Sequence, residues 1–212
     1  MAEVIPEDIN SLPLREKRLG HDLRGLVYDP PEGNFISKTD ILSKFYKTLF
    51  YNHISIHIMP ISVLYSLGIK AQPLDASYYH WQASITGPTG SPYEGGVFYL
   101  YLKVPFNYPF DPPEVRFLTR ILHPNVSRHG DIGIDSILQH NWVIGLTIPK
   151  VLISIQSLLT DPYTDVCMEP EIGDLYDQNR KLFESIARRW TWQFAMGDIM
   201  IQFNKHKPLF VG

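Results

Sequence analysis

Three short β-like runs, separated by turn-rich segments, constrain the fold of this sequence most strongly. They lie at residues 81–85, 97–104 and 114–118, and they are rich in β-branched and aromatic residues. The connecting segment 87–96 is dense in glycine and proline, and segment 107–113 contains three prolines; both compositions favour turns and rigid loops. Connections this short join antiparallel neighbours, because a parallel pairing needs a longer crossover. The pattern therefore predicts an antiparallel meander.

Helical patterns lie on both sides of these runs. Residues 11–27 carry leucines at spacings of four and three, which predicts an amphipathic helix that the prolines of segment 29–33 end. Further along the chain, apolar residues recur at helical spacing behind Pro149 and again behind Pro170. Helix, then strands, then helices predicts an α+β fold.

The composition excludes several kinds of partner and site. A net charge of -3 provides no basic field for nucleic acid or for an anionic membrane, so neither is expected as a partner. The most apolar run, 54–69, is too short to span a bilayer, and the N-terminal residues do not resemble a signal peptide. A single cysteine, Cys167, allows no internal disulfide, and the eight histidines form no metal-binding pattern. We therefore expect a protein of the cytoplasm or nucleus with no metal and no cofactor.

Residues 38–70 differ from the rest of the chain. Six residue types (Ile, Lys, Phe, Tyr, Asn and Met) supply 17 of these 33 positions, and Ala, Arg, Glu and Gln are absent. We interpret the segment as an atypical insertion in a domain that spans 11–196, between tails at 1–10 and 197–212. The bias toward residues with AT-rich codons gives the hypothesis of a translated intron, which a mature messenger that still encodes the segment would contradict. The alternative is a genuine insertion that packs an amphipathic helix on the domain.

Several motifs follow one another in a family order. They are Asp29-Pro30-Pro31, His80-Trp81-Gln82-Ala83, Ser91-Pro92-Tyr93-Glu94-Gly95-Gly96, Tyr108-Pro109-Phe110, His123-Pro124-Asn125 and Ala187-Arg188-Arg189-Trp190-Thr191. Over about residues 14–36 and 71–196 the chain resembles the ubiquitin-conjugating enzymes. The resemblance implies a four-stranded antiparallel meander with one helix before it and helices after it. It also implies an activity, in which ubiquitin or a ubiquitin-like protein is carried as a cysteine thioester and passed to a lysine with help from a ligase.

Glycine occupies the position that the family gives to its catalytic cysteine. The family places this cysteine eight residues after the asparagine of His-Pro-Asn, and counting from Asn125 reaches Gly133. Counting back from Trp142 reaches Ile134 instead, because the intervening stretch is one residue longer than is usual in the family. Thioester transfer needs a thiolate, which neither glycine nor isoleucine supplies. The resemblance therefore implies a degenerate site.

Asn125 follows His123 and Pro124 in the His-Pro-Asn motif. In the family the asparagine amide steadies the oxyanion, or the loop near it, during attack by lysine. An amide aimed at developing charge helps only if an acyl group is bound. We therefore interpret Asn125 as structural, with a side-chain hydrogen bond that closes the turn after Pro124.

Two residues are candidates for a substitute acyl acceptor. Cys167 aligns with a segment that borders the family's catalytic groove, so it is either a displaced nucleophile or an inert loop cysteine. Ser136 would need a base to act, and its alternative role is a hydrogen bond within its loop. Val166 replaces an acidic residue that in the family helps to receive the incoming lysine, which agrees with a degraded site.

The resemblance also implies partner-binding residues. Lys17 and Arg18 align with the basic contacts of the first helix, and the alternative is that they lie on a solvated helix face. Phe110 aligns with an exposed aromatic that anchors ligase domains. The second ligase loop is usually Trp-Ser-Pro-Ala in the family, and its apolar replacements here suit a different partner. These replacements are Val143, Ile144 and Gly145, after Trp142.

Three functions are compatible with these residues. The first is a non-catalytic variant that binds ubiquitin or a ubiquitin-like protein, a ligase or an active conjugating enzyme, and modulates ubiquitin transfer. The second is an active conjugating enzyme that uses Cys167 as a displaced nucleophile. The third is a fold retained for an unrelated protein interaction.

Overall fold

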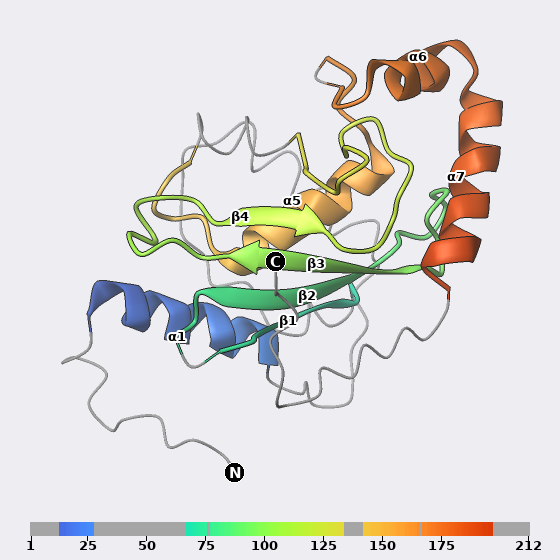
Figure 1. The fold of residues 1–212 in the computed structure, drawn as a ribbon. Coiled ribbons are helices and arrows are strands. Elements are labelled where there is room, and N and C mark those ends of the chain that lie inside the picture. The colour runs from blue at the N-terminus through green and yellow to red at the C-terminus, as the bar shows by residue number, and fades with distance from the viewer. Residues whose placement is uncertain (1–12, 28–66, 76, 134–141, 166, 197–212) are drawn as a thin grey trace, which may run out of the picture.

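The computed structural model describes residues 13–27, 67–75, 77–133, 142–165 and 167–196. Figure 1 shows the elements that these residues form. In chain order they are α1 (Leu14–Val27), β1 (Ile69–Pro73), β2 (His80–Thr86), β3 (Val97–Lys103), β4 (Glu114–Phe117), α5 (Ile148–Thr160), α6 (Pro170–Gln178) and α7 (Arg180–Phe194).

The four strands form one antiparallel sheet in the order β1-β2-β3-β4. Each strand pairs with the next one along the chain, with Ile85 opposite Phe98 and Leu100 opposite Phe117. Strands bury alternate side chains, so one face of the sheet is apolar. The buried residues of β2 and β3 are Trp81, Ala83, Ile85, Phe98, Leu100 and Leu102, each at most 2% exposed. The predicted α+β fold and its four-stranded meander are confirmed.

β1 is the strand that the β-like runs did not predict. It begins at Ile69, which pairs with Ile85, so Ile69 and Lys70 belong to the sheet although the sequence pattern assigns them to the atypical segment. Leu67 is buried as well, and the Gln156 side chain donates a hydrogen bond to its carbonyl at 2.7 Å. Residues 67–70 are therefore integrated into the domain. The remainder of the segment, 38–66, lies outside the described residues, as do the two predicted tails.

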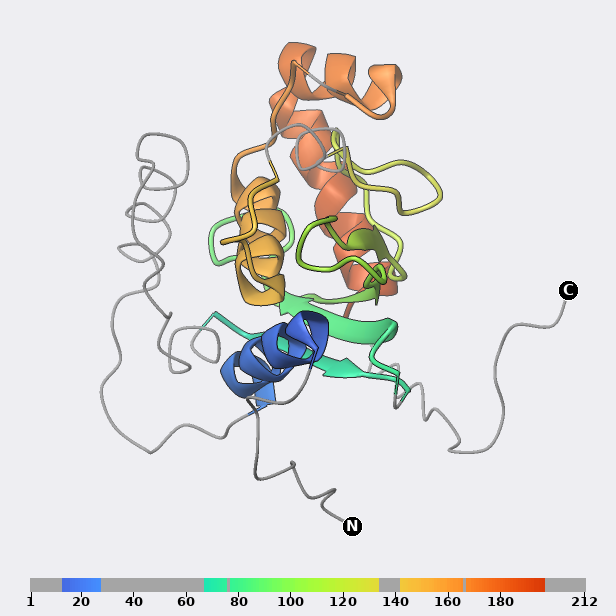
Figure 2. The same ribbon diagram turned by 90° about the vertical axis from the view of Figure 1, so that its left-hand side faces the viewer.

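α5 covers the apolar face of the sheet, and α1 packs against β1, the edge strand (Figure 2). Thr147 caps the start of α5 by accepting a hydrogen bond from the Lys150 amide at 3.3 Å, and Pro149 lies in the first turn. The buried side of α5 includes Val151, Leu152, Ile155 and Leu159. No helix of the described residues is long and apolar enough to cross a bilayer; the longest, α7, has 15 residues.

The apolar pattern behind Pro170 forms two helices, α6 and α7, which meet at Asn179. The Asn179 amide donates to the Leu175 carbonyl at 2.9 Å, and its side chain accepts from the Leu182 amide at 3.1 Å. One residue thus ends α6 and caps α7. α7 then descends to the start of β3, where the Val97 amide donates to the Ala195 carbonyl at 2.9 Å.

Candidate functional site

The His-Pro-Asn segment lies between α5 and the loop that follows it. His123 is fully buried, and its Nε2 lies 2.9 Å from the Leu158 carbonyl. The Asn125 amide donates to His123 Nδ1 at 3.0 Å, so Nδ1 carries no proton and Nε2 is the donor to Leu158. Burial lowers the pKa of His123 to about 4, although the bond to the Leu158 carbonyl opposes this change. The imidazole is therefore neutral and structural.

The Asn125 side chain pairs with the backbone of Tyr163. Its Oδ1 accepts from the Tyr163 amide at 2.9 Å, and its Nδ2 donates to the Tyr163 carbonyl at 2.6 Å. The turn after Pro124 is closed by the backbone instead, where the Val126 amide donates to the His123 carbonyl at 3.1 Å. Asn125 thus holds the loop after α5 against the His-Pro-Asn segment, rather than closing its own turn.

Gly133 is buried beside this segment. Its amide donates to the Asn125 carbonyl at 2.8 Å, and the Met168 amide donates to the Pro124 carbonyl at 2.8 Å. A Cβ added to Gly133 would lie 3.2 Å from Cγ and Sδ of Met168 and 3.5 Å from the Asn125 carbonyl oxygen. Gly133 also has no positive φ. The position therefore has space for a small side chain if Met168 moves by a few tenths of an ångström. Ile134, the other candidate for the cysteine position, lies outside the described residues.

The thiol of Cys167 faces α6. Its Sγ donates to the Thr164 carbonyl at 3.3 Å, and a Cβ added at Gly173 of α6 would overlap this sulfur. Burial raises the pKa of the Cys167 thiol, and the carboxylates of Asp177, Asp174 and Asp165 raise it further. A thiol with a raised pKa is a poor nucleophile near neutral pH. Val166 and Ser136 lie outside the described residues.

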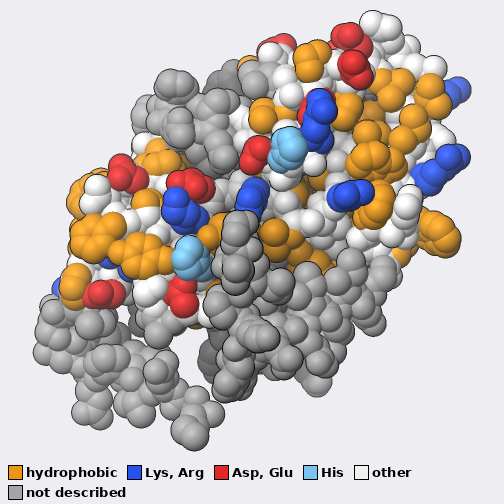
Figure 3. Space-filling model, in the orientation of Figure 1, with side chains coloured by type: hydrophobic (Ala, Val, Ile, Leu, Met, Phe, Trp, Pro, Cys, Tyr) orange, Lys and Arg blue, Asp and Glu red, His pale blue; other side chains and the backbone are white. Residues whose placement is uncertain are grey.

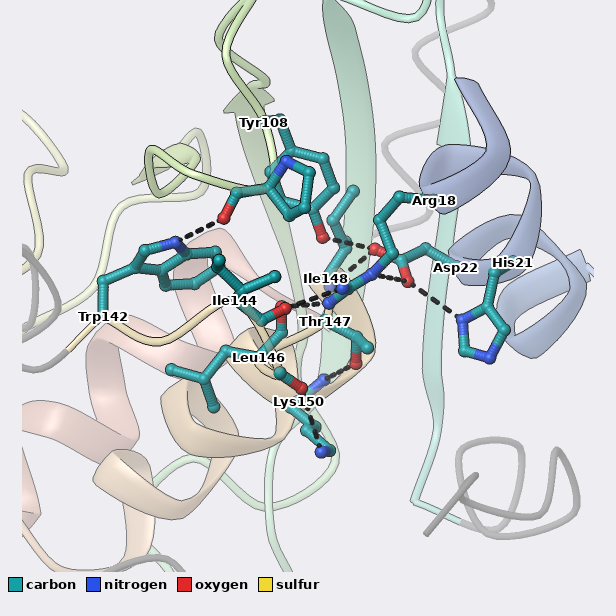
Figure 4. Close-up of polar contacts among 12 residues, drawn as sticks. Arg18, His21, Asp22, Tyr108, Trp142, Ile144, Leu146, Thr147, Ile148 and Lys150 are labelled. Atoms are coloured by element: carbon teal, nitrogen blue, oxygen red, sulfur yellow. Dashed lines mark hydrogen bonds and ion pairs between the residues drawn. The ribbon is translucent and has the colours of Figure 1, made fainter. Parts of the chain in front are cut away.

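The buried carboxylate of Asp22 connects α1 to two loops, the loop that contains Tyr108 and the loop that leads into α5 (Figure 4). Asp22 is 1% exposed, and its Oδ2 accepts hydrogen bonds from the Tyr108 hydroxyl and, at 3.2 Å, from the Ile148 amide. Burial, together with the neighbouring Asp22 carboxylate, raises the pKa of Tyr108, so the phenol remains a donor. The same carboxylate accepts from Arg18 at 3.1 Å.

Arg18 extends this network to the second loop. One guanidinium nitrogen donates to the Ile144 carbonyl at 2.7 Å, and another donates to the Leu146 carbonyl. The sequence predicts a basic partner contact at Arg18, and the structure places its guanidinium in these intramolecular bonds. Lys17, the other predicted contact, lies half-buried on α1.

The predicted aromatic and apolar contacts are exposed on two joined loops. Phe110 is 59% exposed, and Val143 and Ile144 are more than half exposed. Trp142 Nε1 donates to the Pro109 carbonyl at 2.8 Å and so ties the loop of Phe110 to the loop of Val143. Gly145 is half-buried, and its carbonyl accepts from Lys150 Nζ at 3.2 Å. We define Phe110, Val143 and Ile144 as the loop face.

The structure brings together some of the predicted residues and separates others. His123, Pro124, Asn125 and Gly133 form one buried cluster, while Lys17, Arg18 and the loop face lie at the other end of the molecule. The sequence patterns missed Asp22, Tyr163 and Met168. Tyr163 contributes backbone groups, which no residue type reveals, and the contacts of Met168 join segments distant in sequence. An aspartate between Leu19 and Leu23 on an apolar helix stripe was a usable signal for Asp22.

Comparisons with known proteins agree with this geometry. A family model described as ubiquitin-conjugating enzyme matches residues 58–191. A crystal structure of a Plasmodium yoelii protein assigned as a ubiquitin-conjugating enzyme is 36% identical, with a TM-score of 0.59; the match covers 78% of this chain and 99% of that one. The E2 domain of a Toxoplasma gondii ubiquitin-conjugating enzyme is 41% identical, with a TM-score of 0.57, and the match covers 60% of this chain and 90% of the other. With this sheet, this helix order and these matches, the chain belongs to the ubiquitin-conjugating enzyme family.

Proposed function

We propose that this family member does not carry ubiquitin as a thioester and instead modulates ubiquitin transfer by binding other components of the pathway. The observation that carries the proposal is Gly133, which stands eight residues after Asn125, where the family has its cysteine. A hydrogen atom replaces the side chain that would accept the acyl group. Neither Gly133 nor the neighbouring Ile134 supplies the sulfur atom that a thioester needs, so thioester chemistry would require a residue elsewhere in the site.

The surroundings of Cys167 support the non-catalytic function over a displaced nucleophile. The thiol donates a hydrogen bond to the Thr164 carbonyl and packs on Gly173. The residue that contacts Gly133 is the next one along the chain, Met168. Three aspartates raise the thiol pKa in addition to burial. Reactive cysteines have the opposite surroundings, with nearby cations and a lowered pKa.

The loop face supports binding to a partner. Proteins of this family interact with ubiquitin and with ligases. Phe110, Val143 and Ile144 expose apolar surface on loops that Trp142 and Arg18 fix in place, and exposed anchors on a rigid frame are typical of binding hot spots. We assign the partner to a ligase domain, or to an active conjugating enzyme of the cytoplasm or nucleus.

A charging assay tests the absence of thioester chemistry. The full chain is incubated with activating enzyme, ATP and ubiquitin, and the products are separated without reductant beside an active family member as the positive control. We expect no adduct that reductant removes. An adduct that disappears both with reductant and in Cys167→Ala would establish the displaced nucleophile and overturn the proposal.

A titration tests the binding function against a fold retained for an unrelated interaction. Isotope-labelled ubiquitin is titrated with the full chain, and the chain is titrated with a panel of ligase domains and of active conjugating enzymes. We expect chemical-shift changes in at least one of these experiments, and we expect Phe110→Ala to weaken the ligase contact. The absence of changes with ubiquitin, ligase domains and active conjugating enzymes alike would favour the unrelated interaction.

A further inference from the structure

An open pocket lies between α7 and the turn that connects β2 to β3. Its volume is about 350 Å³, within the range of protein ligand sites. The turn contributes Pro92 and Glu94, and α7 with its end contributes Arg188, Trp192 and Met196. The pocket is at the opposite end of the sheet from the loop face, as the positions of α7 and the β3–β4 loop in Figure 1 show. A partner bound here would leave the loop face accessible.

The walls of this pocket are fixed by the fold. A Cβ on Gly96 would lie 2.7 Å from Cγ2 of Thr191 and 3.0 Å from Cβ of Ala195, so only glycine lets α7 approach the turn this closely. The Thr191 hydroxyl lies 3.2 Å from the Pro92 carbonyl and 2.9 Å from the Ala187 carbonyl of its own helix, and the Val97 amide donates to the Ala195 carbonyl at 2.9 Å. The pocket is therefore preformed, which lowers the entropy cost of binding.

Large apolar side chains stand exposed at the rim. Trp192 is 74% exposed and Met196 is 50% exposed. Tryptophan is enriched among residues that dominate binding energy. Burying the rest of its ring needs a partner with an apolar side chain that fits beside it.

The pocket lining contains one basic and one acidic side chain, Arg188 and Glu94, and an excess of positive charge lies along α7. Arg180 and Arg188 share one carboxylate, that of Glu184, at 3.0 Å each. Lys181 and Arg189 are exposed and form no ion pair with any residue that the structure describes. The rim also contains one acidic group, Glu94, which accepts a hydrogen bond from the Gly90 amide at 2.8 Å. Figure 3 shows basic and hydrophobic side chains projecting together from the margin where α7 lies.

We propose that this pocket and the outer face of α7 bind an acidic peptide segment of a partner protein, with a large apolar side chain of the segment seated between Trp192 and Pro92. The carboxylates of the segment pair with Arg189 and Lys181, whose charges no described residue neutralises. Charge complementarity selects an acidic partner, and a concave site of side-chain size selects a peptide over a phosphate backbone or a flat membrane surface.

Three fluorescent peptides test the proposal on the full chain. The first has a central Phe flanked by Glu and Asp, the second replaces the acidic residues by Lys, and the third replaces the Phe by Ala. Fluorescence anisotropy gives the affinities, and vesicles containing phosphatidylserine and a single-stranded oligonucleotide are titrated in parallel. The variants are Trp192→Ala and Arg189→Glu. The matched control is Phe106→Ala, because Phe106 is also 74% exposed but lies on the β3–β4 loop.

We expect only the acidic Phe peptide to bind with measurable affinity. Trp192→Ala and Arg189→Glu should each weaken it by about tenfold or more, as loss of a hot spot does, and Phe106→Ala should not. Circular dichroism checks that each variant is folded. Equal binding of the three peptides, no binding of the acidic one, or an effect of Phe106→Ala equal to that of Trp192→Ala overturns the proposal. Binding confined to vesicles or oligonucleotide overturns it too. Since none of these readouts involves thioester formation or the loop face, their failure leaves the proposed function intact.

Discussion

Asn125 and Tyr163 are joined by two hydrogen bonds that run in opposite directions between one side-chain amide and one peptide unit. The distances are 2.9 Å for the Tyr163 amide and 2.6 Å for its carbonyl. Both Asn125 and the segment on either side of it are buried, whereas the Tyr163 side chain is exposed. The asparagine of the His-Pro-Asn motif therefore has a structural partner within the chain itself.

Replacing Asn125 by Ala should destabilise the fold by about 1–3 kcal/mol, because two backbone groups of Tyr163 lose their partners in a partly buried place. Asn125→Asp should cost at least as much, since a carboxylate would face the Tyr163 carbonyl. Urea denaturation measures both variants. Gln193→Ala, at an exposed position of α7, is the control and should change stability little. If Asn125→Ala unfolded at the same urea concentration as the wild type, the structural role would be wrong.

Stability should fall as the pH falls from about 6.5 to about 4, because of His123. Its folded pKa of about 4 lies below the unfolded value of 6.5, so between these values the unfolded chain binds the extra proton. The contribution is complete above pH about 6.5 and is lost by pH about 4, a change of about 3 kcal/mol. Denaturation across this range measures it. His123→Gln should flatten the slope, whereas Asn125→Ala should shift the whole curve without flattening it. Parallel curves for wild type and His123→Gln would contradict the prediction.

The Gly133→Cys variant should fold, because a small movement of Met168 makes room for the new side chain. In a Cys167→Ala background, Gly133→Cys leaves one thiol, whose Cβ requires Met168 to move slightly, at a cost of about 1 kcal/mol. Gly133→Ile is the matched comparison and should cost more, because its branched side chain meets Met168 and the Asn125 carbonyl together. Thiol labelling and denaturation report the two effects. Equal stability of the two variants would show that the space at Gly133 is larger than the contacts indicate.

Removing Arg18 should loosen the loop of Ile144 and Leu146. Arg18→Ala leaves the buried Asp22 carboxylate without its cation, which should cost about 2–4 kcal/mol. Arg18→Lys should recover only part of this, since an ammonium cannot reach both carbonyls and the carboxylate as a guanidinium fork does. Lys103→Ala breaks the exposed pair with Glu114 and should cost less than about 1 kcal/mol. Amide hydrogen exchange of residues 143–146 should accelerate in Arg18→Ala. Unchanged protection of these amides would show that Arg18 does not stabilise the loop.

Changes on the loop face should alter ligase binding without altering the fold. Phe110→Ala should weaken binding of a responsive ligase domain by about tenfold or more. Val143→Ser with Ile144→Pro approaches the usual family loop, and it should strengthen binding of domains that prefer that loop. Leu118→Ala removes a comparably exposed apolar side chain next to β4 and serves as the control. Calorimetric titration gives the affinities, and an equal loss in Leu118→Ala would mean that the loop face is not the contact.

Local patterns predicted those parts of the fold in which neighbours along the chain are neighbours in space. The meander follows from alternating apolar residues joined by short turns, and Thr147 and Pro149 mark the start of α5. β1 was not predicted, because Ile69–Pro73 contains alanine, glutamine and proline and forms a strand only through its pairing with β2. The break between α6 and α7 at Asn179 was not predicted, because the apolar residues keep their helical spacing across it.

Contacts distant in sequence were the ones that could not be predicted. Arg18 was expected on an accessible helix face, yet its partners are backbone carbonyls 126 and 128 residues away. Asn125 bonds to the backbone of Tyr163, so the residue type at 163 gives no indication of the bond. Motif spacing predicts Gly133 or Ile134 for the family's cysteine position, whereas the contact that Met168 would make with a side chain at Gly133 needed the structure.

The bonds of the His-Pro-Asn segment have a consequence for how genomes are interpreted. A gene copy that no longer transfers ubiquitin would still need His123 for its bond to α5 and Asn125 for its bond to the following loop, because the polypeptide must fold to persist in a cell. Purifying selection on folding alone would preserve that motif long after catalysis was lost. The motif by itself is therefore evidence that a domain folds, and it is not evidence that the domain carries ubiquitin.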